Sequence, residues 1–146
     1  MRIQNFQEFI NEANFAGRAD AIDALDVMIG KKNVLLCGVK PGTAGVHTVT
    51  KIIKERFEND YGQVEDFVGA KHMQAFLDDD AKHLKLILVD DAKSFLTSDT
   101  PVSREALHVL KSSLDEKKLM WVIVTKLPAS KIEPAIRDRM FVIDWN

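Results

Sequence analysis

The stretch from Asn33 to Phe57 constrains the fold of this chain most, because it reads as a strand, a glycine loop and a helix in succession. The apolar run over residues 34–37 is typical of a buried strand. The loop that follows contains three glycines and a proline, and apolar residues then recur at helical spacing as far as Phe57. Glycines let backbone N–H groups turn inward, and a helix N-terminus adds partial positive charge. This arrangement is typical of a loop that cradles phosphate.

The loop lacks the two side chains that a catalytic phosphate loop requires. The motif G-x-x-x-x-G-K-[ST] places a lysine on the β/γ-phosphates and a hydroxyl on Mg²⁺. With Gly45 as the last glycine, Val46 takes the lysine position and His47 the hydroxyl position. Two interpretations stay open: phosphate binding without catalysis, or a turn that only joins a strand to a helix. The candidate nucleotide-binding residues are Gly38, Lys40, Gly42, Thr43, Ala44, Gly45, Val46, His47 and Thr48.

Length and composition indicate a single compact domain over residues 1–146, with 46% hydrophobic and 29% charged residues. The net charge of −2 gives no overall attraction to nucleic acid or membrane, although a local basic patch stays open. The single cysteine, Cys37, cannot form an internal disulfide and is expected in the core. No apolar run reaches the length of a membrane span, and the N-terminus is unlike a secretory signal. We expect a cytoplasmic protein.

Strands and helices alternate along the rest of the chain. Helical spacing predicts helices over 20–29, after a break at Gly17, and over 45–59, 71–77, 102–114 and 128–140. Strands are predicted over 34–37, 63–68, 84–89, 119–125 and 141–143, with a turn at Tyr61-Gly62. Three of these strands are apolar on both faces, which is the pattern of a parallel sheet covered on both sides. The predicted fold class is therefore α/β, a three-layer α/β/α arrangement.

Four segments in this order resemble AAA+ ATPases, and clamp-loader subunits in particular. AGRADAIDAL resembles the segment before the first core strand of that family, and NVLLCGVKPGTAGVHT resembles its Walker A strand and loop. LKLILVDDA is similar to the Walker B strand, and MWVIVTKLPASKIEPAIRDRMFVIDW to the sensor-1 strand, the next helix and the last strand. The resemblance implies a P-loop NTPase fold with a five-stranded parallel sheet in the order 5-1-4-3-2. It also implies that the family's C-terminal lid is absent, since the chain stops at the fifth strand.

The same resemblance implies roles for four further residues and a cofactor, ATP with Mg²⁺. Asp90 would bind Mg²⁺ through water, and Asp91 stands where a glutamate usually activates the attacking water. Thr125 matches the sensor-1 position, which meets the γ-phosphate. Arg139 stands where clamp-loader subunits carry an arginine finger that reaches into a neighbouring subunit. Structural roles stay open beside these: the two aspartates could cap the turn after their strand, and Arg139 could be a solvated residue at a helix end.

Two functions from different classes follow from this pattern. In the first, the chain is a non-catalytic AAA+-like interaction or assembly module, whose partners are AAA+ or replication proteins, or further copies of itself. In the second, it is a minimal ATP-binding protein with weak ATPase activity, in which Lys40 or a partner supplies the missing lysine. The pair Val46-His47 separates the two and favours the first.

The first residues allow two interpretations. In one, residues 1–16 form an anchor in which Phe6 and Phe9 precede the first helix, as in AAA+ domains. In the other, QEFINEA resembles the capsid-targeting leader of internal proteins of large tailed phages, which a protease cuts after a motif that matches Ile10-Asn11-Glu12. The second interpretation would make this a phage-encoded protein.

Overall fold

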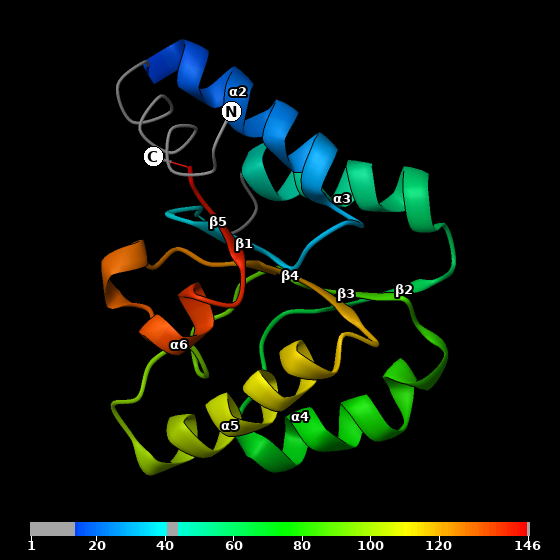
Figure 1. Ribbon diagram of the computed structural model, residues 1–146, viewed down its shortest axis with the longest axis vertical. Coiled ribbons are helices and arrows are strands. Elements are labelled where there is room, and N and C mark those ends of the chain that lie inside the picture. The colour runs from blue at the N-terminus through cyan, green and yellow to red at the C-terminus, as the bar shows by residue number, and fades with distance from the viewer. Residues whose placement is uncertain (1–13, 41–43, 146) are drawn as a thin grey trace.

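A five-stranded parallel sheet forms the centre of the protein, and helices cover both of its faces (Figure 1). The computed structural model describes residues 14–40 and 44–145. The sheet order is β2-β3-β4-β1-β5, which confirms the predicted order 5-1-4-3-2. The strands are β1 (Val34–Cys37), β2 (Tyr61–Val64), β3 (Leu86–Val89), β4 (Met120–Val124) and β5 (Phe141–Asp144).

The helices are divided between the two faces of the sheet. Figure 1 shows α2 and α3 over one face and α4, α5 and α6 over the other. Their bounds are α2 (Asn14–Met28), α3 (Ala44–Phe57), α4 (Gly69–Asp78), α5 (Pro101–Glu116) and α6 (Pro134–Arg137). The three-layer α/β/α prediction is confirmed.

Alternate residues of each strand belong to different cores, because successive side chains of a strand point to opposite faces. In β1, Leu36 belongs to the cluster beneath α2 and α3, whereas Leu35 and Cys37 belong to the cluster beneath α4 and α5. All three side chains are fully buried. This double burial is the physical reason why the three apolar runs read as continuous hydrophobic stretches in the sequence.

The N-terminus of α5 is held by a reciprocal cap. The Thr100 hydroxyl accepts a hydrogen bond from the Ser103 backbone N–H at 3.0 Å, and the Ser103 hydroxyl oxygen accepts one from the Thr100 N–H at 3.1 Å. Pro101 takes the first helical position, where its missing N–H costs nothing. These contacts satisfy N–H groups that the first turn of a helix otherwise leaves free.

The second strand begins earlier than predicted. Tyr61 and Gly62 were predicted to turn, but they pair with Leu86 and Ile87 as the first residues of β2. The turn lies before them instead, where Glu58 adopts a left-handed conformation with φ of 48°. The strand ends at Val64 rather than at residue 68.

The predicted helix over 128–140 is wrong. Only a 3₁₀ turn at Ala129–Lys131 and the four-residue α6 form there. Between them, Ile132 is extended with ψ of 141°, and Glu133 has ψ of 125°, outside the helical range. The physical reason is Pro134, whose ring excludes the helical conformation for the residue before it.

The first helix also differs from its prediction. Gly17 does not break it, because α2 runs continuously from Asn14; an internal glycine costs a helix only about 1 kcal/mol relative to alanine. The helix ends at Met28, and Gly30 follows with φ of 95°. Residues 1–13 lie outside the described residues, and so do both interpretations of the N-terminus.

Candidate functional site

Four of the predicted site residues meet at one edge of the sheet, because parallel strands end on the same side. Gly38 follows β1, Asp90 and Asp91 follow β3, and Thr125 follows β4. Backbone hydrogen bonds tie these strand ends together: the Thr125 N–H donates to the Leu36 carbonyl at 2.9 Å. Ligands gather at this edge in open α/β sheets. We call it the carboxyl edge.

The glycine loop leaves β1 through a left-handed residue and re-enters regular structure at α3. Gly38 has φ of 72°, a conformation that glycine adopts without steric cost. The N–H of Val39 then donates to the Thr125 carbonyl at 2.9 Å, so the start of the loop is fixed to the end of β4. Gly42 and Thr43 lie outside the described residues. Helix α3 begins at Ala44, and its first four N–H groups have no partner within the helix.

Two buried side chains fill the space beside the first turn of α3. A Cβ atom on Gly45 would lie 2.9 Å from Cγ1 of Val39 and 3.2 Å from Cε2 of Trp145. Both of these side chains are buried, Val39 at 1% and Trp145 at 6% exposure. No side chain fits at Gly45 unless its neighbours move. Gly45, the last glycine of the loop, therefore lies directly against these two side chains.

Three of the side chains that follow Gly45 contact α3 itself or the core beneath it. Val46 is half-buried and packs against the core cluster beneath α2 and α3. The Thr48 hydroxyl donates to the Ala44 carbonyl at 2.9 Å, and the Thr50 hydroxyl donates to the Val46 carbonyl at 2.8 Å. These hydroxyl protons are therefore used inside α3. His47 is exposed, and so is Lys40 at the start of the loop.

Thr125 is fully buried and supports the turn after β4. Its hydroxyl oxygen accepts a hydrogen bond from the Leu127 N–H at 3.1 Å. The Leu127 carbonyl in turn accepts from the Gly38 N–H at 3.1 Å. The predicted sensor residue thus joins the turn after β4 to the first residue of the glycine loop.

The two aspartates after β3 have different surroundings. Asp90 accepts a hydrogen bond from the Gln63 amide of β2, with 2.5 Å between Nε2 and Oδ2. Asp91 is mostly buried, and its Oδ2 lies 3.8 Å from the Lys93 ammonium. Its other oxygen, Oδ1, is buried and has no hydrogen-bond partner, unlike every other buried side-chain oxygen or nitrogen among the described residues.

Sequence reasoning missed Asp66, which organises the segment after Asp91. Its carboxylate accepts a hydrogen bond from the Ser94 hydroxyl at 2.6 Å and from the Lys93 N–H at 3.2 Å. An acidic residue just after a strand is a signal for a site residue. The predicted strand over 63–68 included Asp66, so this signal was not recognised. Gln63 was missed as well. Its amide reaches Asp90 because β2 and β3 are neighbours in the sheet.

The described residues at the carboxyl edge lack the lysine of a catalytic Mg²⁺–ATP site. No group of three His, Cys, Asp or Glu side chains within residues 20–40 and 44–145 could hold a metal ion. The first turn of α3 presents no lysine, and the Thr48 hydroxyl proton is donated within the helix. One oxygen of Asp90 is engaged by Gln63.

Cys37 ends β1 as an inert thiol. Burial, together with the negative charge of Asp144 in the neighbouring strand, raises the pKa of the thiol to about 12, and the opposing effect of Arg137 is smaller. The thiolate is the reactive form of cysteine, so the neutral thiol at physiological pH is unreactive. The predicted core role of Cys37 is confirmed.

Arg139 lies at the opposite edge of the sheet, just before β5. Its guanidinium donates to Asp115 of α5, with 3.0 Å between Nε and Oδ1, and to the Ala135 carbonyl at 2.9 Å. The side chain keeps 35% of its surface exposed. The structure therefore separates Arg139 from the other three predicted catalytic residues of its own chain, Asp90, Asp91 and Thr125.

The fold is that of AAA+ P-loop proteins, as comparison with solved structures shows. A DNA polymerase III gamma-subunit-related protein from Thermotoga maritima superposes with a TM-score of 0.57 at 12% sequence identity, over 86% of this chain and 46% of that one. Two mutant RuvB proteins from Thermotoga maritima superpose with TM-scores of 0.54 at 16% identity, over 94% and 97% of this chain. The chain spans less than half the length of these proteins, since the matches cover 44% of each RuvB chain. No family model matches the sequence, and no curated protein matches it significantly.

None of the helices in the described part of the chain has the length and apolar character needed to cross a membrane.

Proposed function

We propose that this chain is an AAA+-like domain that acts as a non-catalytic interaction or assembly module, with AAA+ or replication proteins as its partners. The observation that carries the proposal is Val46, which stands at the lysine position of the motif and packs against the core cluster beneath α2 and α3. The closed space beside Gly45 supports it, because Val39 and Trp145 already fill the room next to the first turn of α3.

The energetic consequence is weak nucleotide binding. A hydrogen bond to a charged group contributes about 1.5–3 kcal/mol, and a phosphate-binding lysine makes more than one. Catalysis of phosphoryl transfer depends almost entirely on positioned charges, so losing that lysine removes transition-state stabilisation as well as affinity. A scaffold that keeps its fold without these charges retains surfaces for binding other proteins.

We expect that the protein does not turn over ATP and that restoring the motif does not rescue it. In the variant Val46→Lys/His47→Thr, the lysine would begin from a half-buried position that faces the core, so calorimetry should detect no gain in ATP affinity. Phosphate release at high protein concentration measures turnover, with Asp90→Ala as the control and circular dichroism as the check of folding. Turnover that disappears in Asp90→Ala, or clear tightening in the double variant, would contradict the proposal.

A second candidate function, a minimal ATP-binding protein, is favoured by one observation. The buried oxygen Oδ1 of Asp91 has no partner, and a bound ligand or cation could satisfy it. The same titration with ATP and Mg²⁺ separates the candidates when it is repeated with Asp91→Asn. Binding to the parent that is lost in this variant would favour the second candidate over the first.

The amino-terminal side of β5 is the surface where we expect a protein partner, and Arg139 is its test residue. We expect Arg139→Ala to reduce partner recovery severalfold while lowering the free energy of unfolding by no more than about 1 kcal/mol, because an exposed ion pair contributes little to folding. Recovery from extracts of the native host, with bound proteins identified by mass spectrometry, measures the first effect. Thermal unfolding measures the second.

Asp115→Ala is the matched control for this experiment. It breaks the same ion pair, whose two side chains are 35% and 60% exposed, but it leaves the guanidinium available to a partner. Partner recovery should therefore stay at the parent level in Asp115→Ala. Equal losses in the two variants would assign the effect to the ion pair, and equal recovery from the parent and Arg139→Ala would remove the arginine from the interface.

A further inference from the structure

A basic cleft lies at the edge of the sheet opposite the glycine loop, where β1, β3, β4 and β5 begin. Its volume is about 620 Å³. Six basic residues line it, against one acidic residue, Asp138. The basic residues are Lys31, Lys32, Lys85, Lys117, Lys118 and Arg139. This concentration of positive charge contrasts with the net charge of −2 for the whole chain.

Four of these six charges are not neutralised by neighbours. Arg139 pairs with Asp115, and the Lys85 ammonium lies 3.5 Å from Asp60. The other four lysines, at 31, 32, 117 and 118, make no ion pair with the described part of the chain. All four are exposed. A cleft with one sign of charge attracts a polyanion and accelerates its approach.

The backbone segments that carry the lysines are fixed to the sheet. The N–H groups of Lys31 and Lys32 both donate to the Met28 carbonyl, at 2.9 and 3.1 Å. Asn33 joins two further segments, because its side-chain oxygen accepts from the Trp121 N–H at 2.8 Å and its carbonyl accepts from the Phe141 N–H at 2.8 Å. Binding would therefore order lysine side chains, but not the loops that carry them.

The charges follow the order of the strands along the edge. Lys85 precedes β3, the pair Lys117-Lys118 precedes β4, the pair Lys31-Lys32 precedes β1, and Arg139 precedes β5. Adjacent strands are about 4.8 Å apart, so the row extends roughly 14 Å along the edge. A row of charges suits a polymer with a charge on every repeat better than it suits a single anion.

The chemistry of the row distinguishes between two kinds of polyanion. Lysine is depleted in protein–protein interfaces, whereas contacts to the phosphate backbone of nucleic acids are made largely by Lys and Arg. Phe141, the aromatic residue that lines the cleft, is buried, so it offers no platform for base stacking. The positive charges of the cleft are mostly the point charges of lysine.

We propose that this cleft binds the phosphate backbone of duplex nucleic acid without sequence preference. The cleft includes Arg139, the residue expected above to contact a protein partner, but the duplex proposal is tested on the lysines alone. Its driving force is the release of counterions from the duplex, which makes the affinity fall steeply as salt rises.

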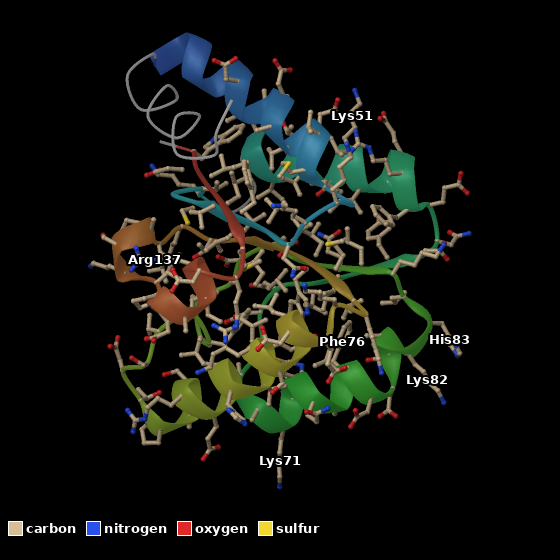
Figure 2. The ribbon with its side chains drawn as sticks, viewed as in Figure 1. Lys51, Lys71, Phe76, Lys82, His83 and Arg137 are labelled. Carbon is tan, nitrogen blue, oxygen red and sulfur yellow. The ribbon has the colours of Figure 1, made fainter. Side chains whose placement is uncertain are left out.

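The test compares two variants with equal loss of charge. The cleft variant is Lys31→Gln/Lys32→Gln/Lys118→Gln, and the control variant is Lys51→Gln/Lys54→Gln/Lys71→Gln. The control lysines lie on α3 and α4, and Figure 2 shows Lys51 and Lys71 pointing away from the body of the protein. The probe is a fluorescently labelled duplex of about 20 base pairs, followed by anisotropy from 50 to 200 mM salt, the range over which backbone contacts weaken strongly.

We expect the parent to bind the duplex, with a logarithmic salt slope of about −0.9 per phosphate neutralised. The cleft variant should bind at least about tenfold more weakly at 50 mM salt, with a slope smaller by about 2–3, since each phosphate-contacting lysine contributes about 1 to the slope. The control variant should stay close to the parent, because its lysines lie outside the cleft. Thermal unfolding confirms that all three proteins are folded.

Lys117→Gly separates the loss of a cleft charge from a loss of stability. Lys117 has φ of 58°, a conformation that glycine prefers, so this substitution should stabilise the chain while it removes one cleft charge. We expect weaker duplex binding together with a higher melting temperature. Unchanged binding in this variant and in the cleft variant would overturn the proposal.

Two further outcomes would also overturn it. The first is an equal loss of binding in the cleft and control variants, which would show that binding depends on the net charge of the protein and not on the cleft. The second is competition by polyglutamate as effective, per charge, as competition by unlabelled duplex, which would assign the cleft to an acidic protein surface.

Discussion

Replacing Trp121 with alanine should lower the free energy of unfolding by about 3–5 kcal/mol, the cost typical of removing a large aromatic side chain from a core. Trp121 lies in β4 and is fully buried. Its ring meets that of Phe67 edge to face, with 6.1 Å between centroids, and Phe67 also contacts Phe76 and Phe95. The alanine variant would leave a cavity where the sheet meets α4 and α5. Urea unfolding measures the loss.

Two controls divide this loss into its parts. The Trp121 indole N–H donates to the Ser113 hydroxyl of α5 at 2.8 Å, so Ser113→Ala removes that hydrogen bond and keeps the ring. We expect it to cost about 1 kcal/mol. The loss of unfolding free energy in Trp121→Phe should lie between those of Ser113→Ala and Trp121→Ala, because phenylalanine keeps most of the apolar volume. A Trp121→Ala protein that unfolds at the same urea concentration as the parent would show that this core is not organised around β4.

Gly45→Ala should destabilise the protein by about 1–3 kcal/mol, the usual cost of overpacking a core. The sign of the change in stability is informative, because alanine in a helix is otherwise about 1 kcal/mol more stabilising than glycine. The added Cβ would meet Val39 Cγ1 at 2.9 Å and the Trp145 ring at 3.2 Å, and both side chains are buried. Calorimetric and urea unfolding of the parent and the variant measure the difference.

A double-mutant cycle with Val39→Ala tests the cause. Val39→Ala alone should destabilise the chain, but combined with Gly45→Ala it should cost less than the sum, because the shortened side chain makes room for the new methyl group. A stabilising Gly45→Ala would show that the space beside the first turn of α3 is open.

Three members of the candidate site were predictable from the sequence, but Asp66, Gln63 and the contacts within the site were not. Asp90, Asp91 and Thr125 follow apolar runs, and parallel strands end at one edge, so the sequence places them together. The hydrogen bond from the Leu127 N–H to the Thr125 hydroxyl depends on the turn after β4, which no residue pattern specifies. The unpartnered oxygen of Asp91 likewise depends on how the chain packs around it.

The basic cleft shows a limit of a different kind. Its lysines are visible in the sequence as pairs before β1 and β4 and a single residue before β3. Each pair alone is an ordinary polar turn. The residues become neighbours only because the sheet order places β1, β4 and β3 side by side, although their positions run from 31 to 118.

The sequence by itself determined the layers of this protein and the residue types that follow Gly45. Runs such as residues 86–89 are apolar at every position, and only a sheet covered on both faces buries such a strand. No arrangement of the chain can place a lysine at Val46. Tertiary structure alone decided that α6 is a single turn and that the space beside Gly45 is closed by Trp145, a residue 100 positions away. The physical reason is that hydrophobic periodicity reports which side of an element is buried, whereas the neighbour that buries it is set by close packing across the whole core.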